Sequence, residues 1–141
     1  MKNFFYLILM ICGLVSGFEA QAQQVFLTGT DTVACFHSDT IFGCQNEVLV
    51  TINSGTGEIK DANGDFIYTL ASNGNLTDLN NDLIGTIDIS GNVKDSNQDL
   101  IGTVSGGEVR DLNNDLLGTS GTTPAGYAAF YYFFFRMEGG L

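Results

Sequence analysis

Four short stretches of this chain each place an aspartate, an asparagine and a second aspartate at alternate positions. Side-chain oxygens in this Asp-x-Asn-x-Asp order open the calcium-binding loop of EF-hand proteins, which makes Ca²⁺ the first ligand to consider. The twelve residues are Asp61, Asn63, Asp65, Asp78, Asn80, Asp82, Asp95, Asn97, Asp99, Asp111, Asn113 and Asp115.

An EF-hand loop also needs a bidentate acid at its twelfth position, and none of the four stretches has one. The residues found there are Ser72, Ile89, Gly106 and Thr122. Aspartate and asparagine are equally the residues that build tight hairpin turns, which explains the motif without an ion. We therefore interpret the stretches as turns with a solvated acidic rim. Weak Ca²⁺ binding is the alternative, and no other cofactor is predicted.

Other reactive side chains are few. The chain has a single histidine, His37, and it lacks the GxSxG, HExxH and phosphate-loop motifs. No nucleophile and base can therefore be paired, and no catalytic residue is predicted. The many acids recur as turn residues, so no single carboxylate pair stands out as in a glycosidase. The sequence predicts a protein that is not an enzyme.

Residues 1–22 have the three-part layout of a secretory signal peptide. Lys2 gives the positive start, residues 4–15 form an apolar run, and a small-x-small site ends at Ala22. We expect cleavage after Ala22 and a secreted or periplasmic product. A lipoprotein anchor at Cys12 is the alternative, but the two residues before it are bulkier than a lipoprotein peptidase prefers.

Export would leave Cys35 and Cys44 in an oxidising compartment, where disulfides form and persist. Nine positions apart, they are predicted to close a small loop near the mature N-terminus. The alternative is that one or both are small buried apolar residues. The chain has no CxxC pair, so a cysteine metal site is not expected.

The Asp-x-Asn-x-Asp motifs belong to a longer pattern whose copies begin at Gly57, Gly74, Gly91 and Gly107, at intervals of 17, 17 and 16 residues. Residues 39–52 align with 74–87 without a gap, which makes a fifth, divergent copy. A fixed period indicates one supersecondary unit repeated side by side. The predicted divisions are a signal peptide at 1–22, a lead-in strand or irregular cover at 23–38, five repeats at 39–56, 57–73, 74–90, 91–106 and 107–121, and an aromatic segment with a tail at 122–141.

Each copy has the pattern of a β-hairpin. A short strand with one central apolar residue leads into the Asp-Asn turn, and a second strand rich in β-branched residues follows. Glycine and asparagine recur too often for a helix. A single hairpin of this size is marginally stable, so the copies must share a core. Gly85, Gly102 and Gly118 occupy one repeat position, where a glycine allows close approach of neighbouring units.

After the repeats, residues 127–135 carry seven aromatic side chains in nine positions. This run is too short to span a membrane as a helix, which needs about twenty residues. So much aromatic surface requires burial, and we predict that the segment closes the repeat assembly. The sequence leaves open whether the segment is a strand or a short helix, with its aromatic content slightly favouring a strand.

The formal net charge is −11. An acidic surface repels phosphate backbones, so no nucleic-acid partner is expected. The partner that a surface of this kind would bind stays unknown from sequence.

The repeated unit, best written in GNVKDSNQDLIGTV (91–104), resembles that of the bacterial five-fold β-flower proteins, as do the signal peptide and the terminal Ala-Ala-aromatic run. The resemblance covers about residues 39–135. It implies an all-β fold of five hairpins arranged as petals around an axis, and it implies no activity. The expected function is that of a secreted structural or interaction protein.

Overall fold

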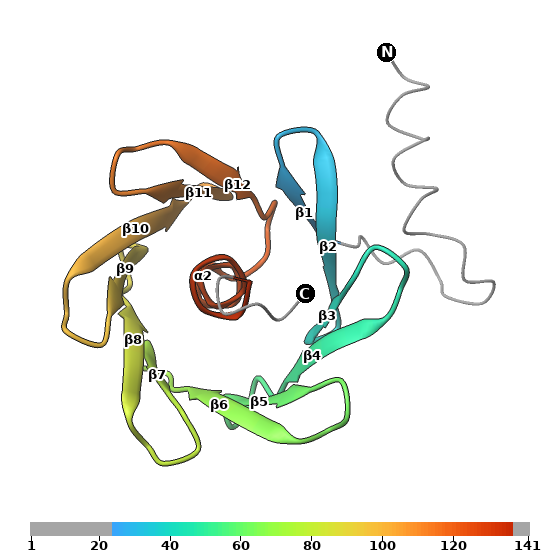
Figure 1. Cartoon of the computed structure of the whole chain (residues 1–141), viewed down its shortest axis with the longest axis vertical. Coiled ribbons are helices and arrows are strands. Elements are labelled where there is room, and N and C mark those ends of the chain that lie inside the picture. Colours follow the sequence, from blue (N-terminus) through green and yellow to red (C-terminus); the bar gives the residue numbers. More distant parts are fainter. Residues whose placement is uncertain (1–23, 137–141) are drawn as a thin grey trace.

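The computed structural model describes residues 24–136, which form one closed antiparallel sheet around a central helix (Figure 1). The predicted signal peptide and the tail 137–141 lie outside the described residues. The strands are β1 (Gln24–Thr28), β2 (Asp31–His37), β3 (Thr40–Phe42), β4 (Val48–Ile52), β5 (Glu58–Asp61), β6 (Phe66–Leu70), β7 (Asn75–Thr77), β8 (Leu83–Ile87), β9 (Asn92–Asp95), β10 (Leu100–Ser105), β11 (Glu108–Asp111) and β12 (Leu116–Thr119). The helix comprises α2 (Ala125–Ala129) and η1 (Phe130–Phe135).

Each strand pairs with its neighbours in sequence, and β1 pairs with β12 to complete the ring. We number the consecutive pairs hairpin 1 (β1–β2) to hairpin 6 (β11–β12). The five predicted repeats are hairpins 2 to 6, which confirms the all-β repeat fold. The lead-in 23–38 adds a further hairpin, so the described residues build six petals rather than five (Figure 1).

Hairpin 1 has the same structure as the other five hairpins, although its sequence lacks the repeat motif. In all six hairpins a buried first-strand residue faces a fixed position of the second strand, and a β-bulge follows that residue pair. The pairs are Phe26–Ala34, Ile41–Val50, Ile59–Tyr68, Leu76–Gly85, Val93–Gly102 and Val109–Gly118. All six first-strand side chains are fully buried, and together they line the inside of the ring. Bulges bend a strand and increase its twist, which suits a small closed ring.

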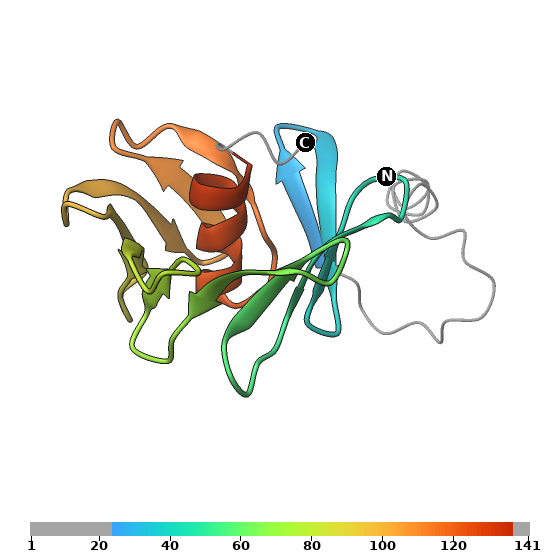
Figure 2. The ribbon, with the colours of Figure 1, turned by 60° about the horizontal axis from the view of Figure 1, so that its bottom comes forward.

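The aromatic segment closes the assembly as predicted, and of the two conformations that the sequence left open it adopts the helix. Figure 2 shows the helix inside the ring of hairpins. Phe130 to Phe134 are at most 6% exposed. A closed sheet has no free edge, so a strand on the axis would leave its backbone N–H and C=O groups buried without partners. A helix satisfies these groups internally.

The last part of this helix, η1, is a π-helix, in which each N–H bonds to the carbonyl five residues earlier. The final bond of this kind runs from the Arg136 N–H to the Tyr131 carbonyl oxygen, at 2.9 Å. The wider turn carries consecutive aromatic side chains outward in several directions. This arrangement lets a single helix contact hairpins on different sides of the ring.

The repeated glycines form sockets for these rings. A Cβ atom on Gly85 would collide with the Phe134 ring, and on Gly102 with the Phe133 ring. On Gly118 it would lie 2.7 Å from Cε1 of Tyr132. Each would also collide with a carbonyl oxygen of the adjoining strand. The predicted close approach is confirmed, and the helix as well as the neighbouring hairpin requires it.

The ring closes between β1 and β12, where Leu27 lies opposite Thr119. Tyr132 reinforces this seam, because its hydroxyl lies 2.8 Å from the Leu27 carbonyl oxygen and 2.9 Å from that of Thr119. Arg136 adds a hydrogen bond from Nη1 to the Thr28 hydroxyl, at 2.8 Å. The C-terminal helix therefore holds the first and last hairpins together.

Candidate functional site

The Asp-x-Asn-x-Asp residues lie in exposed turns at the tips of hairpins 3 to 6. In each turn, Oδ1 of the first aspartate accepts backbone N–H groups two and four residues later. In hairpin 3 these bonds run from the N–H of Asn63 and Asp65 to Asp61, at 2.8 and 2.9 Å. The same pair of bonds is made by Asp78, Asp95 and Asp111.

These bonds are the turn chemistry expected of aspartate. The fourth residue of each turn is left-handed, and it is a glycine in hairpin 3, an asparagine in hairpins 4 and 6 and a glutamine in hairpin 5. The N–H of Asp65, followed by that of Asn63, lowers the pKa of the Asp61 carboxyl and keeps it ionised. The hairpin 3 turn is therefore built around a charged oxygen acceptor.

A Ca²⁺ ion would need several oxygens that converge on one point. Within residues 24–136, no group of three histidine, cysteine, aspartate or glutamate side chains is placed to hold a metal ion. The first aspartate of each turn already uses one carboxylate oxygen in the turn itself. Weak Ca²⁺ binding at these tips stays a prediction.

The predicted disulfide partners lie on neighbouring hairpins. Cys35 is buried on β2, whereas Cys44 is exposed in the tip turn of hairpin 2. Phe42, and not Cys44, is the register partner of Cys35 across β2 and β3. The Cys44 thiol donates to the Thr32 carbonyl oxygen at 2.9 Å. Both sulphurs are thiols in this structure, and their oxidation after export stays a prediction.

Buried tyrosines in the axial helix are strongly perturbed. Desolvation by burial raises the pKa of both Tyr131 and Tyr132 to about 12. The hydroxyl of Tyr131 donates to the Val33 carbonyl oxygen at 3.2 Å. Because these hydroxyls hold backbone carbonyls of hairpin 1 and the seam, the shifts reflect a structural role.

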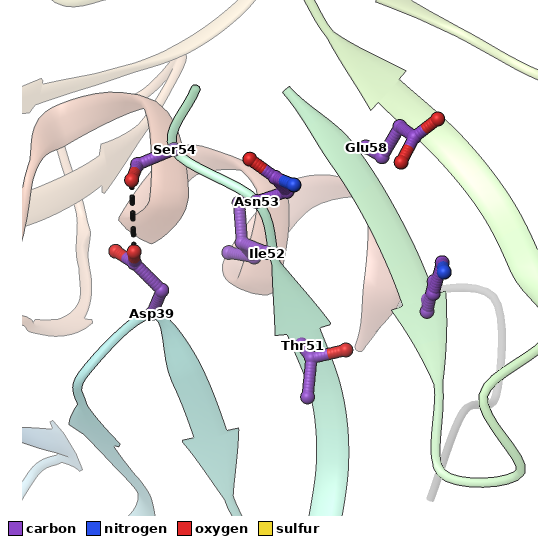
Figure 3. A pocket seen from close by; sticks show the side chains of 7 residues that line it. Asp39, Thr51, Ile52, Asn53, Ser54 and Glu58 are labelled. Carbon is purple, nitrogen blue, oxygen red and sulfur yellow. Dashed lines mark hydrogen bonds between the residues drawn. The ribbon is translucent and has the colours of Figure 1, made fainter. Parts of the chain in front are cut away.

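An open pocket of about 300 Å³ lies between hairpins 2 and 3. Its lining residues are Asp39, Thr51, Ile52, Asn53, Ser54, Glu58 and Lys60. Figure 3 shows Asp39 and Ser54 facing each other, with Oγ of Ser54 donating to Oδ2 of Asp39 at 2.9 Å. Asn53 is held by its own turn, because its Oδ1 accepts the N–H of Gly55 and Thr56, at 3.0 and 3.1 Å.

This pocket also lies near the start of the axial helix. Burial raises the pKa of Tyr127, and the negative charge of Asp39 raises it further. The Tyr127 ring packs on Phe36 with centroids 5.5 Å apart. The pocket is lined by acidic, basic, amide and hydroxyl groups, with Ile52 as its buried apolar side chain.

Sequence reasoning missed this pocket, although a signal for it was present. The gapless alignment of 39–52 with 74–87 places Asp39 over Gly74, so an acid stands where other copies have glycine. Lys60 and Glu58 gave no such signal, because both occupy ordinary polar positions of a strand.

Twelve antiparallel strands in a closed ring of hairpins, with an aromatic helix on the axis, define a β-flower class of protein. The family model described as "5-fold beta-flower protein" matches residues 22–136. The chain therefore belongs to the 5-fold β-flower family. No curated protein and no solved structure matches it. Among the described residues, no helix is long and apolar enough to cross a membrane.

Proposed function

We propose that this β-flower protein is exported and acts without catalysis, as a structural or interaction module. The main observation behind the proposal is that side chains of the helix fill the axis of the ring. Tyr131 and its neighbours occupy the place where a ring-shaped fold would hold a substrate, and they are packed as a core. The surface available to other molecules is therefore the outside of the hairpins.

Charge and chemistry support the same function. Among residues 24–136, the titratable groups with shifted pKa values are tyrosines of the axial helix and the turn aspartates Asp61 and Asp88. At Asp88 the side-chain amide of Asn92 is the main cause of the lowered pKa. All these groups serve the local structure, and none is paired with a nucleophile as catalysis would need.

Export is tested by fractionating cells that produce the native chain and measuring the mass of the product. We expect a product beginning at Gln23 in the periplasm or medium. A full-length product in the cytoplasm would contradict export. The interaction role is tested by affinity capture from the same fraction, using the exported protein as bait. Hydrolytic turnover that a single side-chain change abolishes would contradict the non-enzymatic part.

Weak Ca²⁺ binding is the second candidate, favoured by the repeated carboxylates at four hairpin tips. Calorimetry and thermal unfolding in millimolar Ca²⁺ test it, with Mg²⁺ as the control, because extracellular calcium modules bind in this range. Heat of binding and a raised melting temperature with Ca²⁺ alone would support the site. The absence of both would exclude it.

A further inference from the structure

The sequence contains two asparagine-glycine pairs, Asn63–Gly64 and Asn73–Gly74. In such a pair the glycine backbone nitrogen can attack the side-chain amide carbon of the asparagine, because glycine has no side chain to hinder the approach. A C–N bond forms, the side-chain amide leaves as ammonia, and a succinimide ring results. Water then opens the ring to aspartate or to isoaspartate. The net reaction consumes one water molecule and needs no other reactant.

The second pair is held by the strand beside it. The Gly74 carbonyl oxygen accepts the Ile87 N–H at 2.8 Å, and a Cβ atom on Gly74 would collide with the Ile87 carbonyl oxygen. Oδ1 of Asn73 accepts the Asn75 N–H at 3.1 Å. Closing a succinimide ring requires the backbone between Asn73 and Gly74 to rotate. That rotation would disturb the end of the β7–β8 pairing.

The first pair lies at the tip of hairpin 3, where residues 62–65 are all exposed. Apart from its chain neighbours, no atom of residues 24–136 lies within 4 Å of the place where a Cβ atom on Gly64 would stand. The side-chain Nδ2 of Asn63 donates to Oδ2 of Asp61 at 3.4 Å, which is long for a hydrogen bond. The tip can therefore rotate without displacing another strand.

One restraint is common to both pairs. The Gly64 N–H donates to the Asp61 carbonyl oxygen at 3.0 Å, and the Gly74 N–H donates to the Ala71 carbonyl oxygen at 2.9 Å. Each of these bonds must break before the nitrogen attacks, so they do not distinguish the pairs. The surroundings do, because an exposed turn opens locally at a low free-energy cost and a paired strand end opens at a higher one.

We propose that Asn63 is a site of spontaneous deamidation in the folded protein, whereas Asn73 is protected until the chain unfolds. The product turn carries aspartate or isoaspartate between Asp61 and Asp65, so the tip of hairpin 3 gains a third carboxylate. Isoaspartate also lengthens the main chain by one atom inside the turn that Asp61 holds. The charge and shape of this tip therefore change as the exported protein ages.

The other tips provide internal controls. Hairpins 4 to 6 have the same turn, but Asn81, Gln98 and Asn114 stand in place of Gly64. A side chain at this position hinders the attack, so the asparagines that precede these residues should react slowly. The three control asparagines are Asn80, Asn97 and Asn113.

The test incubates the purified exported protein at mildly alkaline pH, in native buffer and in urea, and follows each asparagine by peptide mass spectrometry. In native buffer Asn63 should react at least about ten-fold faster than Asn73, which corresponds to a small difference in the cost of opening. In urea the two rates should agree within about two-fold, because the folded surroundings are gone. Enzymatic methylation of isoaspartate distinguishes it from aspartate.

Gly64→Asn introduces the residue that hairpins 4 and 6 have at this position, and it should slow the reaction at Asn63 by about ten-fold or more. Gly29→Asn is the matched control, because Gly29 is also a left-handed glycine with open space around it and follows Thr28. It should leave the rate at Asn63 unchanged. Thermal unfolding verifies that each variant is folded.

Three results would overturn the proposal. The first is a rate at Asn63 in native buffer that is no higher than the rate at Asn73. The second is a control asparagine in hairpins 4 to 6 that reacts as fast as Asn63. The third is an unchanged rate at Asn63 in Gly64→Asn.

Discussion

Gly102→Ala should destabilise the protein far more than an added methyl group usually does. An ideal Cβ atom at this position would lie 2.6 Å from Cε1 of Phe133 and would also collide with the Arg110 carbonyl oxygen. Carbon atoms in contact normally lie about 3.5–4.0 Å apart, so the ring would have to move by roughly 1 Å. Overpacking a core costs about 1–3 kcal/mol, and the backbone clash adds to it. We expect a loss of about 2–4 kcal/mol.

Urea unfolding followed by circular dichroism measures this loss. Gly55→Ala is the matched control, because Gly55 has an ordinary φ and its added Cβ would meet one exposed side-chain oxygen at 3.3 Å. That change should alter the stability by less than about 1 kcal/mol in either direction. Combining Gly102→Ala with Phe133→Leu should recover about 1 kcal/mol, since neighbouring sites couple. Equal stability of Gly102→Ala and Gly55→Ala would show that the Phe133 ring does not need a glycine at position 102.

Three further predictions concern the seam, the axial helix and the turns. Tyr132→Phe removes the hydroxyl at the seam and should cost about 1–3 kcal/mol, with faster hydrogen exchange in β1 and β12; unchanged exchange would show that the hydroxyl does not hold the ring. The pKa values of Tyr131 and Tyr132 are raised from 10.0 to about 12, so the folded state favours the neutral phenol. The stability from this burial is complete below pH 10 and is lost as the pH rises towards 12; an ultraviolet titration in which these tyrosines ionise near 10 without unfolding would contradict it. Asp95→Ala leaves two N–H groups of the hairpin 5 turn without their acceptor and should lower the stability by about 0.5–2 kcal/mol, equally with and without Ca²⁺; a loss confined to Ca²⁺-containing buffer would show instead that the ion is bound there.

Hairpins 3 to 6 were predictable because their turns repeat side chains that have a direct conformational role, and hairpin 2 was predictable because residues 39–52 align with 74–87 without a gap. Hairpin 1 was not predictable in this way. Its register places Thr28 opposite Asp31, so its tip is a two-residue turn with Gly29 in the left-handed conformation. A turn of this kind needs no Asp-x-Asn-x-Asp motif, and Phe26 alone marks the core position. The count of five therefore followed the repeated sequence pattern, whereas the ring is defined by the buried first-strand residues.

The helical state of residues 125–135 followed from a property of the whole ring that no local pattern contains. Aromatic residues favour strands because they pack well on a pleated surface. That preference assumes a sheet edge on which the strand can add. Once twelve strands close the ring, Tyr131 and its neighbours have no such edge, and backbone satisfaction outweighs propensity. The candidate pocket was hidden for a similar reason, since it forms only where hairpins 2 and 3 meet.

In a ring of similar units, the residues that pack against the axial helix and the residues that could bind a partner are under different constraints. Three units present a glycine to the axial helix, at Gly85, Gly102 and Gly118. At the same repeat position the other three units have Ala34, Val50 and Tyr68. Asp39 breaks the pattern, because it stands where the other copies have glycine, and its carboxylate accepts a hydrogen bond from Ser54. The search for a partner should therefore begin at hairpins 2 and 3, and the regular tips of hairpins 4 to 6 should serve as internal controls.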